Sequence, residues 1–205
     1  MTTGQTGTPE PVWRSPTPNA TIPRVQGLFL EEMEKFVHRE LGDPGLARVR
    51  SLVGRGNKGY QFDKSYPDNE LGLIVRGLAE ATGAPPTQLL EMYGEAMVPG
   101  LLEVYGFLVN PRWSFIDLLL NTESLIHAGV RLNSPGAKPP VIGAQLIDAG
   151  TVVMTYKSQR RLCAVARGIL RGCATYYKVE IMIADNKCML RGDSECVLTV
   201  RGEEI

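Results

Sequence analysis

The stretch Ser114–Arg160 decides the fold, and it reads SFIDLLLNTESLIHAGVRLNSPGAKPPVIGAQLIDAGTVVMTYKSQR. Its first part predicts a helix, because apolar residues and one histidine recur at close to whole numbers of helical turns and therefore share one face. These positions are Ile116, Leu120, His127 and Val130. The helix is expected to begin at Ser114, which forms a capping-box pattern with Asp117. The pattern thus predicts an imidazole in an apolar wall.

The hydrophobic period changes after Pro140, where short runs rich in β-branched residues begin. The elements predicted there are strands over 141–147 and 151–158, a helix over 161–177, and strands over 178–190 and 196–201. Upstream, apolar stripes predict helices that begin near Val25, Pro44, Leu71 and Thr87. We therefore expect an α+β fold with an N-terminal helical part and a C-terminal four-stranded antiparallel sheet with helices.

Composition limits the classes of protein that the chain can represent. It has 205 residues, 43% of them hydrophobic, which suffices for one sizeable core. Lys+Arg and Asp+Glu are equal at 22 each, so no basic field favours nucleic acid. No apolar run approaches the ~20 residues of a membrane span, and no signal segment opens the chain, so we expect a cytoplasmic protein without membrane contact.

The chain is expected to form a single domain behind a tail. Residues 1–24 are rich in Thr, Pro and Gly, a composition typical of a flexible segment. The domain over 25–205 is predicted to divide into a helical subdomain over 25–112 and an α/β subdomain over 113–205 that includes the His127 helix.

Three polar residues are expected to converge at the end of the second predicted strand. Tyr156, Ser158 and Arg160 are two residues apart, so they should point to one side and suit carboxylates. An apolar cavity with one imidazole on its wall and an anion clamp at its edge is what a heme with two propionates needs. Two simpler interpretations stay open: His127 as a core histidine, and Arg160 as part of a solvated basic cluster.

His127, the Pro139-Pro140 pair and the Tyr-x-Ser-x-Arg motif together resemble the H-NOX (heme nitric oxide/oxygen binding) family. The likeness extends loosely from about Val25 to the end of the chain. It implies a heme b with His127 as the proximal iron ligand and Pro140 in the heme site. The residues to which it assigns the propionates are Tyr156, Ser158 and Arg160. With one protein ligand, the iron would keep an open face for a diatomic gas.

The opposite wall of the heme site decides which gas binds. In H-NOX proteins that hold oxygen, a Tyr on the helix after the clamp donates a hydrogen bond to the gas, and Val165 takes that position here. Ile169 lies one turn further on, and Phe29 is expected to face them. All three lack a donor, so we expect stable complexes with NO and CO and none with O₂. A simpler interpretation is that these three residues only fill the core. Tyr176 and Tyr177 remain less favoured candidates for the hydrogen-bond donor.

Four cysteines form a second candidate site. Cys188 and Cys196 flank the last hairpin and are expected to face each other, which gives half of a zinc site. Some H-NOX proteins hold a structural zinc, and the resemblance assigns its ligands to Cys163, Asp185, Cys188 and Cys196, with Asp185 where the family has a His. Buried small apolar residues and a redox-active thiol pair remain as alternatives.

The resemblance implies a heme-based NO sensor that signals to a separate effector, such as a histidine kinase, a diguanylate cyclase or a chemotaxis component. NO would weaken the bond between the iron and His127, and the His127 helix would shift with the N-terminal helices. No catalytic motif stands out, so we expect no enzyme.

The alternative function is a heme-free small-molecule-binding module of the vinyl-reductase type, which the Cys-x7-Cys hairpin resembles, with a structural zinc/cysteine site. A cysteine-dependent enzyme is the third hypothesis.

Overall fold

The computed structural model describes residues 24–134 and 137–204. Its N-terminal elements are β1 (Arg24–Gln26), α1 (Gly27–Leu52), β2 (Ser65–Pro67), α2 (Asp68–Thr82), α3 (Pro86–Ala96), α4 (Val98–Tyr105) and the 3-10 turn η1 (Gly106–Leu108). The C-terminal elements are α5 (Phe115–Asn121), η2 (Thr122–His127), α6 (Ala128–Asn133), β3 (Val141–Asp148), β4 (Thr151–Lys157), α7 (Cys163–Tyr177), β5 (Val179–Lys187), the 3-10 turn η3 (Met189–Arg191) and β6 (Cys196–Glu204). The expected tail lies outside the described residues except for Arg24, as do Pro135 and Gly136 of the turn after the His127 helix.

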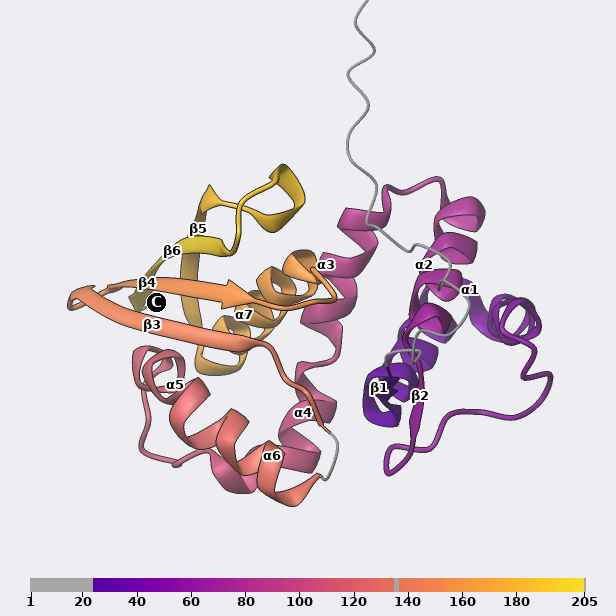
Figure 1. Ribbon diagram of the computed structural model, residues 1–205, viewed down its shortest axis with the longest axis horizontal. Helices are drawn as coiled ribbons and strands as arrows, with labels where there is room; N and C mark the ends of the chain where they lie inside the picture. The colour runs from indigo at the N-terminus through magenta and orange to yellow at the C-terminus, as the bar shows by residue number, and fades with distance from the viewer. Residues whose placement is uncertain (1–23, 135–136, 205) are drawn as a thin grey trace, which may run out of the picture.

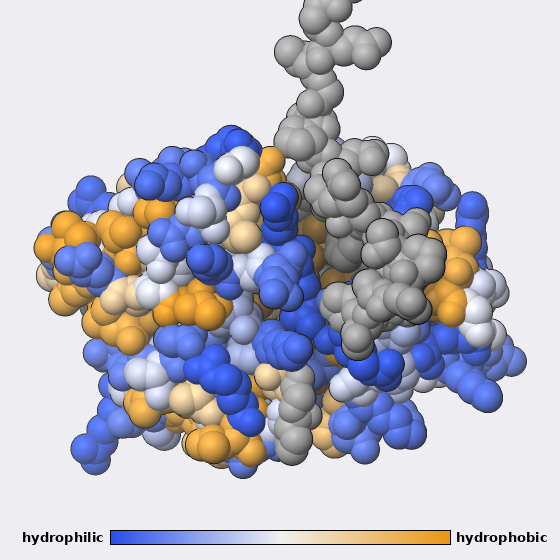
Figure 2. Space-filling view, in the orientation of Figure 1, coloured by the Kyte–Doolittle hydropathy of each residue, from blue (hydrophilic) through white to orange (hydrophobic). Residues whose placement is uncertain are grey.

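Figure 1 shows how these elements are grouped in space, and Figure 2 shows the same view coloured by hydropathy. Helices α1 and α2 lie on one side with the small β1–β2 pair, the larger sheet lies on the other side with α5 and α7, and α3 runs between the two groups. The larger sheet has the order β3-β4-β6-β5 and is antiparallel throughout. The predicted α+β class is therefore confirmed. The division of the chain near residue 112 stays a prediction.

Two predictions for the first helix have different outcomes. The separation of the helices predicted to begin near Val25 and near Pro44 is confirmed, because Gly42 interrupts α1 with a φ of +66°, a conformation that favours glycine. The prediction that Val25 belongs to the helix is wrong, since Val25 pairs with Tyr66 in the β1–β2 ladder. A three-residue strand is too short to show a period of two in the sequence, so both strands escape pattern analysis.

One face of the larger sheet is covered by helices. Alternate residues on its strands point to this face, where α5 and α7 pack against them. The core formed there contains Phe115, Leu119, Val152, Met154, Leu170, Ala174, Leu198 and Val200. A second and larger core joins α1, α2 and α3 to the first half of α7, and it includes Leu30, Met33, Phe36, Leu71, Ile74, Leu78, Leu89, Tyr93 and Val165. Helix α7 therefore contributes to both cores.

Glycines bring α3 and α7 close together. A Cβ on Gly168 would lie 2.0 Å from the Glu91 carbonyl oxygen, and a Cβ on Gly94 would lie 2.3 Å from the Val165 carbonyl oxygen. Neither backbone can move away cheaply, because each belongs to a packed helix. This contact fixes α7 against the helical part and so sets where Val165 lies.

Gly168→Ala is expected to lower the free energy of unfolding by about 3 kcal/mol, because the new methyl group would overlap the α3 backbone. Gly106→Ala is the matched control, since a Cβ there meets nothing within 4 Å and the backbone φ of −59° is helical. Urea unfolding of both variants measures the difference. Equal stability of the two variants would contradict the close approach of α3 and α7.

Candidate functional site

His127 is the last residue of η2, and its side chain is only 16% exposed. Its Nδ1 lies 3.0 Å from Oε2 of Glu123, one turn earlier on the same segment. Burial lowers the pKa of His127, although hydrogen bonds to Glu123 and to the Pro140 backbone act in the opposite direction. The imidazole is therefore neutral near pH 7, the form in which a ring nitrogen can bind a metal.

The segment that carries His127 is a π-helix rather than an α-helix. In a π-helix the hydrogen bonds run from residue i to residue i+5, so each turn contains more residues than the 3.6 of an α-helix. Ile116 and Leu120 precede this segment and pack against the core of the larger sheet. The predicted face shared by Leu120 and His127 assumed a constant period, and that period does not hold across η2. Glu123 and the Pro140 backbone both hydrogen-bond the ring.

Tyr156 and Ser158 are close together as predicted, but a turn after the strand, rather than strand alternation, brings them together. Strand β4 ends at Lys157, and the chain then turns, with the Arg161 N–H donating to the Ser158 carbonyl and a φ of +51° at Arg161. Tyr156 is buried and shares a side-chain hydrogen bond with Ser158. Burial raises the pKa of the Tyr156 phenol, so it stays protonated and can donate. The expectation of strand alternation is wrong beyond Lys157, because the turn redirects the chain.

Arg160 joins three separate segments. Its Nε donates to Asp68 Oδ2 at 2.8 Å, its Nη1 donates to the Lys138 carbonyl at 3.1 Å, and its Nη2 donates to the Arg24 carbonyl at 2.5 Å. Asp68 opens α2, Arg24 opens β1, and Lys138 precedes the two prolines after the His127 helix. Arg160 thus connects the helical part to the His127 region through hydrogen bonds. It is therefore not a member of a solvated basic cluster.

The carboxylate that receives Arg160 is incompletely satisfied. Asp68 Oδ1 is buried and has no hydrogen-bond partner among the described residues. Asp68 is held in place by its neighbours, because Tyr66 pairs with Val25 and the Arg55 guanidinium lies 4.2 Å from the centre of the Tyr66 ring. The pair with Arg160 is therefore the strong contact that stabilises this carboxylate within the described part of the chain.

The three residues predicted for the gas-binding wall belong to the same core. Val165 is buried in the larger core, and Phe29 and Ile169 pack against the same core from α1 and α7. None of these side chains has a hydrogen-bond donor. The two tyrosines considered as alternative donors do not belong to this core. Tyr176 is 59% exposed, and Tyr177 packs against the core of the larger sheet.

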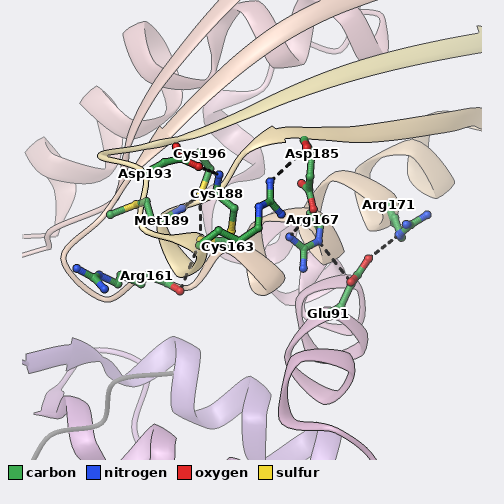
Figure 3. Close-up of polar contacts among 11 residues, drawn as sticks. Glu91, Arg161, Cys163, Arg167, Arg171, Asp185, Cys188, Met189, Asp193 and Cys196 are labelled. Carbon is green, nitrogen blue, oxygen red and sulfur yellow. Dashed lines mark hydrogen bonds and ion pairs between the residues drawn. The ribbon is translucent and has the colours of Figure 1, made fainter. Parts of the chain in front are cut away.

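The thiols of Cys163, Cys188 and Cys196 form a buried cluster, shown in Figure 3. Their Sγ atoms all lie within 4.8 Å of one another, and those of Cys163 and Cys196 are 3.0 Å apart. Burial raises the pKa of Cys163 and Cys196, so both are protonated thiols until a metal ion displaces the proton. Tyr156 packs against the same cluster. Cys173 lies apart, against the sheet core, and burial raises its pKa to about 12.

The structure does not place Asp185 with these thiols. Its Oδ2 pairs with Arg167 Nη1 at 3.2 Å, and Arg167 and Arg171 both contact Glu91 of α3 (Figure 3). The cluster of closely spaced metal-ligating atoms found among residues 24–134 and 137–204 contains the three cysteines and no carboxylate. The geometry therefore does not support Asp185 as a fourth zinc ligand, because its carboxylate faces Arg167 of α7.

The side chains at His127 and Arg160 fit a heme. One neutral imidazole is available for iron, and a phenol, a hydroxyl and a guanidinium can receive carboxylates. Arg160 can keep Asp68 through Nε while its two Nη atoms exchange neutral carbonyls for an ionised propionate, which is the stronger partner. Neither of two surface hollows, of about 440 and 190 Å³, includes these residues, so the donor set rather than a hollow defines the site.

Comparison with solved structures identifies the architecture. An H-NOX protein from Shewanella oneidensis in the Fe(II)NO ligation state is 25% identical, with a TM-score of 0.83 over 88% of this chain and 100% of that chain. A mutant of the T. Tengcongensis H-NOX protein is 18% identical, with a TM-score of 0.78 over 88% of this chain and 98% of that chain. The fold is therefore the H-NOX fold. No curated protein matches the chain.

The family model described as Haem-NO-binding matches residues 26–185. The chain belongs to this haem-NO-binding, or H-NOX, family, whose members bind heme and sense gases. The predicted family is thus confirmed.

Among the described residues, no helix is both long enough and apolar enough to cross a bilayer.

Sequence patterns missed two residues at this site. Glu123 stands four residues before His127, a spacing at which side chains meet on a helix, so this signal was available in the sequence. Asp68 is 92 residues from Arg160, and no local pattern could pair them.

Proposed function

We propose that the protein is a heme-based nitric oxide sensor with a five-coordinate ferrous heme b. In this proposal His127 is the proximal iron ligand, and Pro140 lies in the heme site. The residues that hold the propionates are Tyr156, Ser158 and Arg160. The observation that carries the proposal is the neutral, carboxylate-held ring of His127 in a chain whose family binds heme.

The proposed gas selectivity rests on the wall formed by Phe29, Val165 and Ile169. Bound O₂ carries partial negative charge and gains from a hydrogen bond, whereas NO on ferrous iron depends on it far less. The three side chains pack in the same core and donate none. The protein is therefore proposed to form stable complexes with NO and CO, and none with O₂.

The proposed signal starts at His127. Bound heme would supply a ferrous iron able to bind NO, and His127 would be the side chain released when its bond to the iron weakens. The ring is tied through Glu123 to Arg131 and to the Ile142 N–H of β3, so a change at His127 reaches both α6 and the sheet. Such a two-state element can bias a separate effector, such as a histidine kinase, a diguanylate cyclase or a chemotaxis component.

We also propose that the protein is cytoplasmic. Its four free thiols suit the reducing environment of that compartment.

The absorption spectrum of the purified protein tests this function. After reduction, a Soret band of a five-coordinate heme is expected, and NO and CO should each shift it. Exposure of the reduced protein to air should yield the ferric form without a lasting oxy spectrum. A colourless protein that takes up no added hemin would instead favour the heme-free binding module.

We also propose that Cys163, Cys188 and Cys196 hold a structural zinc ion. Three thiolates are common zinc ligands, and the three Sγ atoms already lie within 4.8 Å of one another. The ion would join the start of α7 to the β5–β6 connection, and Tyr156 packs beside it. It would thereby stabilise the turn that carries the propionate clamp.

Metal analysis of the purified protein is expected to give about one zinc per chain, and Cys196→Ser should abolish most of it. Cys173→Ser is the matched control, because this thiol lies outside the cluster and should leave the zinc content unchanged. Zinc content that is absent from the wild-type protein, or equal in both variants, would contradict the assignment.

A further inference from the structure

We propose that Glu123 is a positioning residue for His127: it sets the orientation and the donor strength of the imidazole and so controls how readily NO releases it from the iron. This inference rests on the proposed function. It assigns to the Glu123 carboxylate the control of how easily the bond between the iron and His127 breaks when NO binds.

Glu123 is held from three directions. Its Oε2 receives the Ile142 N–H at 3.0 Å and faces His127 Nδ1 at 3.0 Å. Its Oε1 receives Arg131 Nη2 at 2.7 Å. A side chain with this many fixed partners has little rotational freedom, so the imidazole that it contacts is fixed as well.

The contact also determines which nitrogen of the ring is free. An ionised carboxylate can only accept, so Nδ1 must carry the proton that is shared with Glu123. The lone pair is then on Nε2, the nitrogen proposed to bind the iron, in a ring that also hydrogen-bonds the Pro140 backbone. A carboxylate on the far side of a metal-bound imidazole raises its basicity and strengthens its bond to the metal.

The π-helical segment makes the contact useful for signalling. Glu123 and His127 both belong to η2, whereas Ile142 lies on β3 and Arg131 lies on α6. Release of His127 would remove one partner of Glu123 and leave the other two, so the carboxylate can follow the sheet or α6 while the ring moves. A π-segment is an irregular element that can rearrange locally without unfolding the helix.

Glu123→Gln separates charge from geometry. With its oxygen in the place of Oε2, glutamine can still accept from His127 and from Ile142, but it carries no charge and cannot pair with Arg131. Arg131→Gln is the matched control, because it removes the same ion pair and leaves the carboxylate on His127. Glu123→Ala removes all three contacts.

The experiment is resonance Raman spectroscopy of the ferrous proteins, combined with the rate at which NO converts the six-coordinate complex into the five-coordinate one. Glu123→Gln is expected to lower the iron–histidine stretching frequency and to speed the conversion about tenfold, and Glu123→Ala should do both to a greater extent. Arg131→Gln should resemble the wild type.

Two failures are distinguishable. If the wild-type protein binds heme through His127 but the three variants share its stretching frequency, the role of Glu123 is overturned and the NO sensor stands. If the wild-type protein takes up no heme, or if its heme is not bound by His127, both proposals are overturned. A frequency change of equal size in Arg131→Gln also overturns the inference, because the ion pair rather than the contact with His127 would then be responsible.

Discussion

His127→Gly is expected to remove the five-coordinate spectrum of the reduced protein and to accelerate heme loss at least tenfold. The proximal ligand would be the one bond between the chain and the iron, and the propionate clamp alone cannot replace it. The absorption spectrum of the reduced variant and the rate of heme transfer to an acceptor protein measure both effects.

The same variant offers a rescue test. Glycine leaves space where the buried ring lay, so added imidazole should enter, bind the iron and restore the spectrum. His38→Gly is the matched control, because His38 is 55% exposed and pairs with Asp43 at the surface. Its spectrum should equal that of the wild type. A His127→Gly protein with an unchanged spectrum would show that another group binds the iron.

Arg160→Ala is expected to lower the free energy of unfolding of the heme-free protein by about 2–3 kcal/mol, because it leaves Asp68 as a nearly buried carboxylate without its partner. The value is below that of a fully buried pair, since the Arg160 side chain is 22% exposed. The variant should also lose heme faster than the wild type, because a bidentate donor to the propionates is missing. Urea unfolding and heme transfer measure the two losses separately.

Two further variants isolate the causes. Lys157→Ala removes an exposed cation from the same segment and should change neither quantity. Asp68→Ala combined with Arg160→Ala should recover part of the stability, because no unpaired carboxylate remains, yet it should not recover heme retention. Equal heme loss in Arg160→Ala and Lys157→Ala would contradict the clamp assignment.

The secondary structure was largely predictable from local signals. The capping box at Ser114 and the hairpin turn between the strands predicted over 141–147 and 151–158 are each present where the sequence indicates. Each depends on residues within a few positions of one another, so a pattern of caps, turns and periods is sufficient. The strands β1 and β2 were missed because three residues carry no period.

The candidate site was predictable only in part. The family motif indicated His127, Tyr156, Ser158 and Arg160, and the structure brings Tyr156 and Ser158 into contact. The expected alternation to Arg160 is wrong, because the strand ends at Lys157. The cysteine cluster formed as the hairpin spacing suggested, whereas Asp185 turned to Arg167. The first error arose where a strand was assumed to continue, and the second where a family position was carried over to a different residue type.

The sequence by itself determined the order of the helices and of the larger sheet's strands, the family, and the residue types proposed for iron, propionates and zinc. These properties follow from short-range periodicity and from motif spacing, both of which are written along the chain. Only the tertiary structure decided that Arg160 reaches Asp68 and that Glu123 holds both His127 and the Ile142 N–H. These contacts depend on how distant segments pack, and on a π-turn whose hydrogen bonds no local pattern specifies.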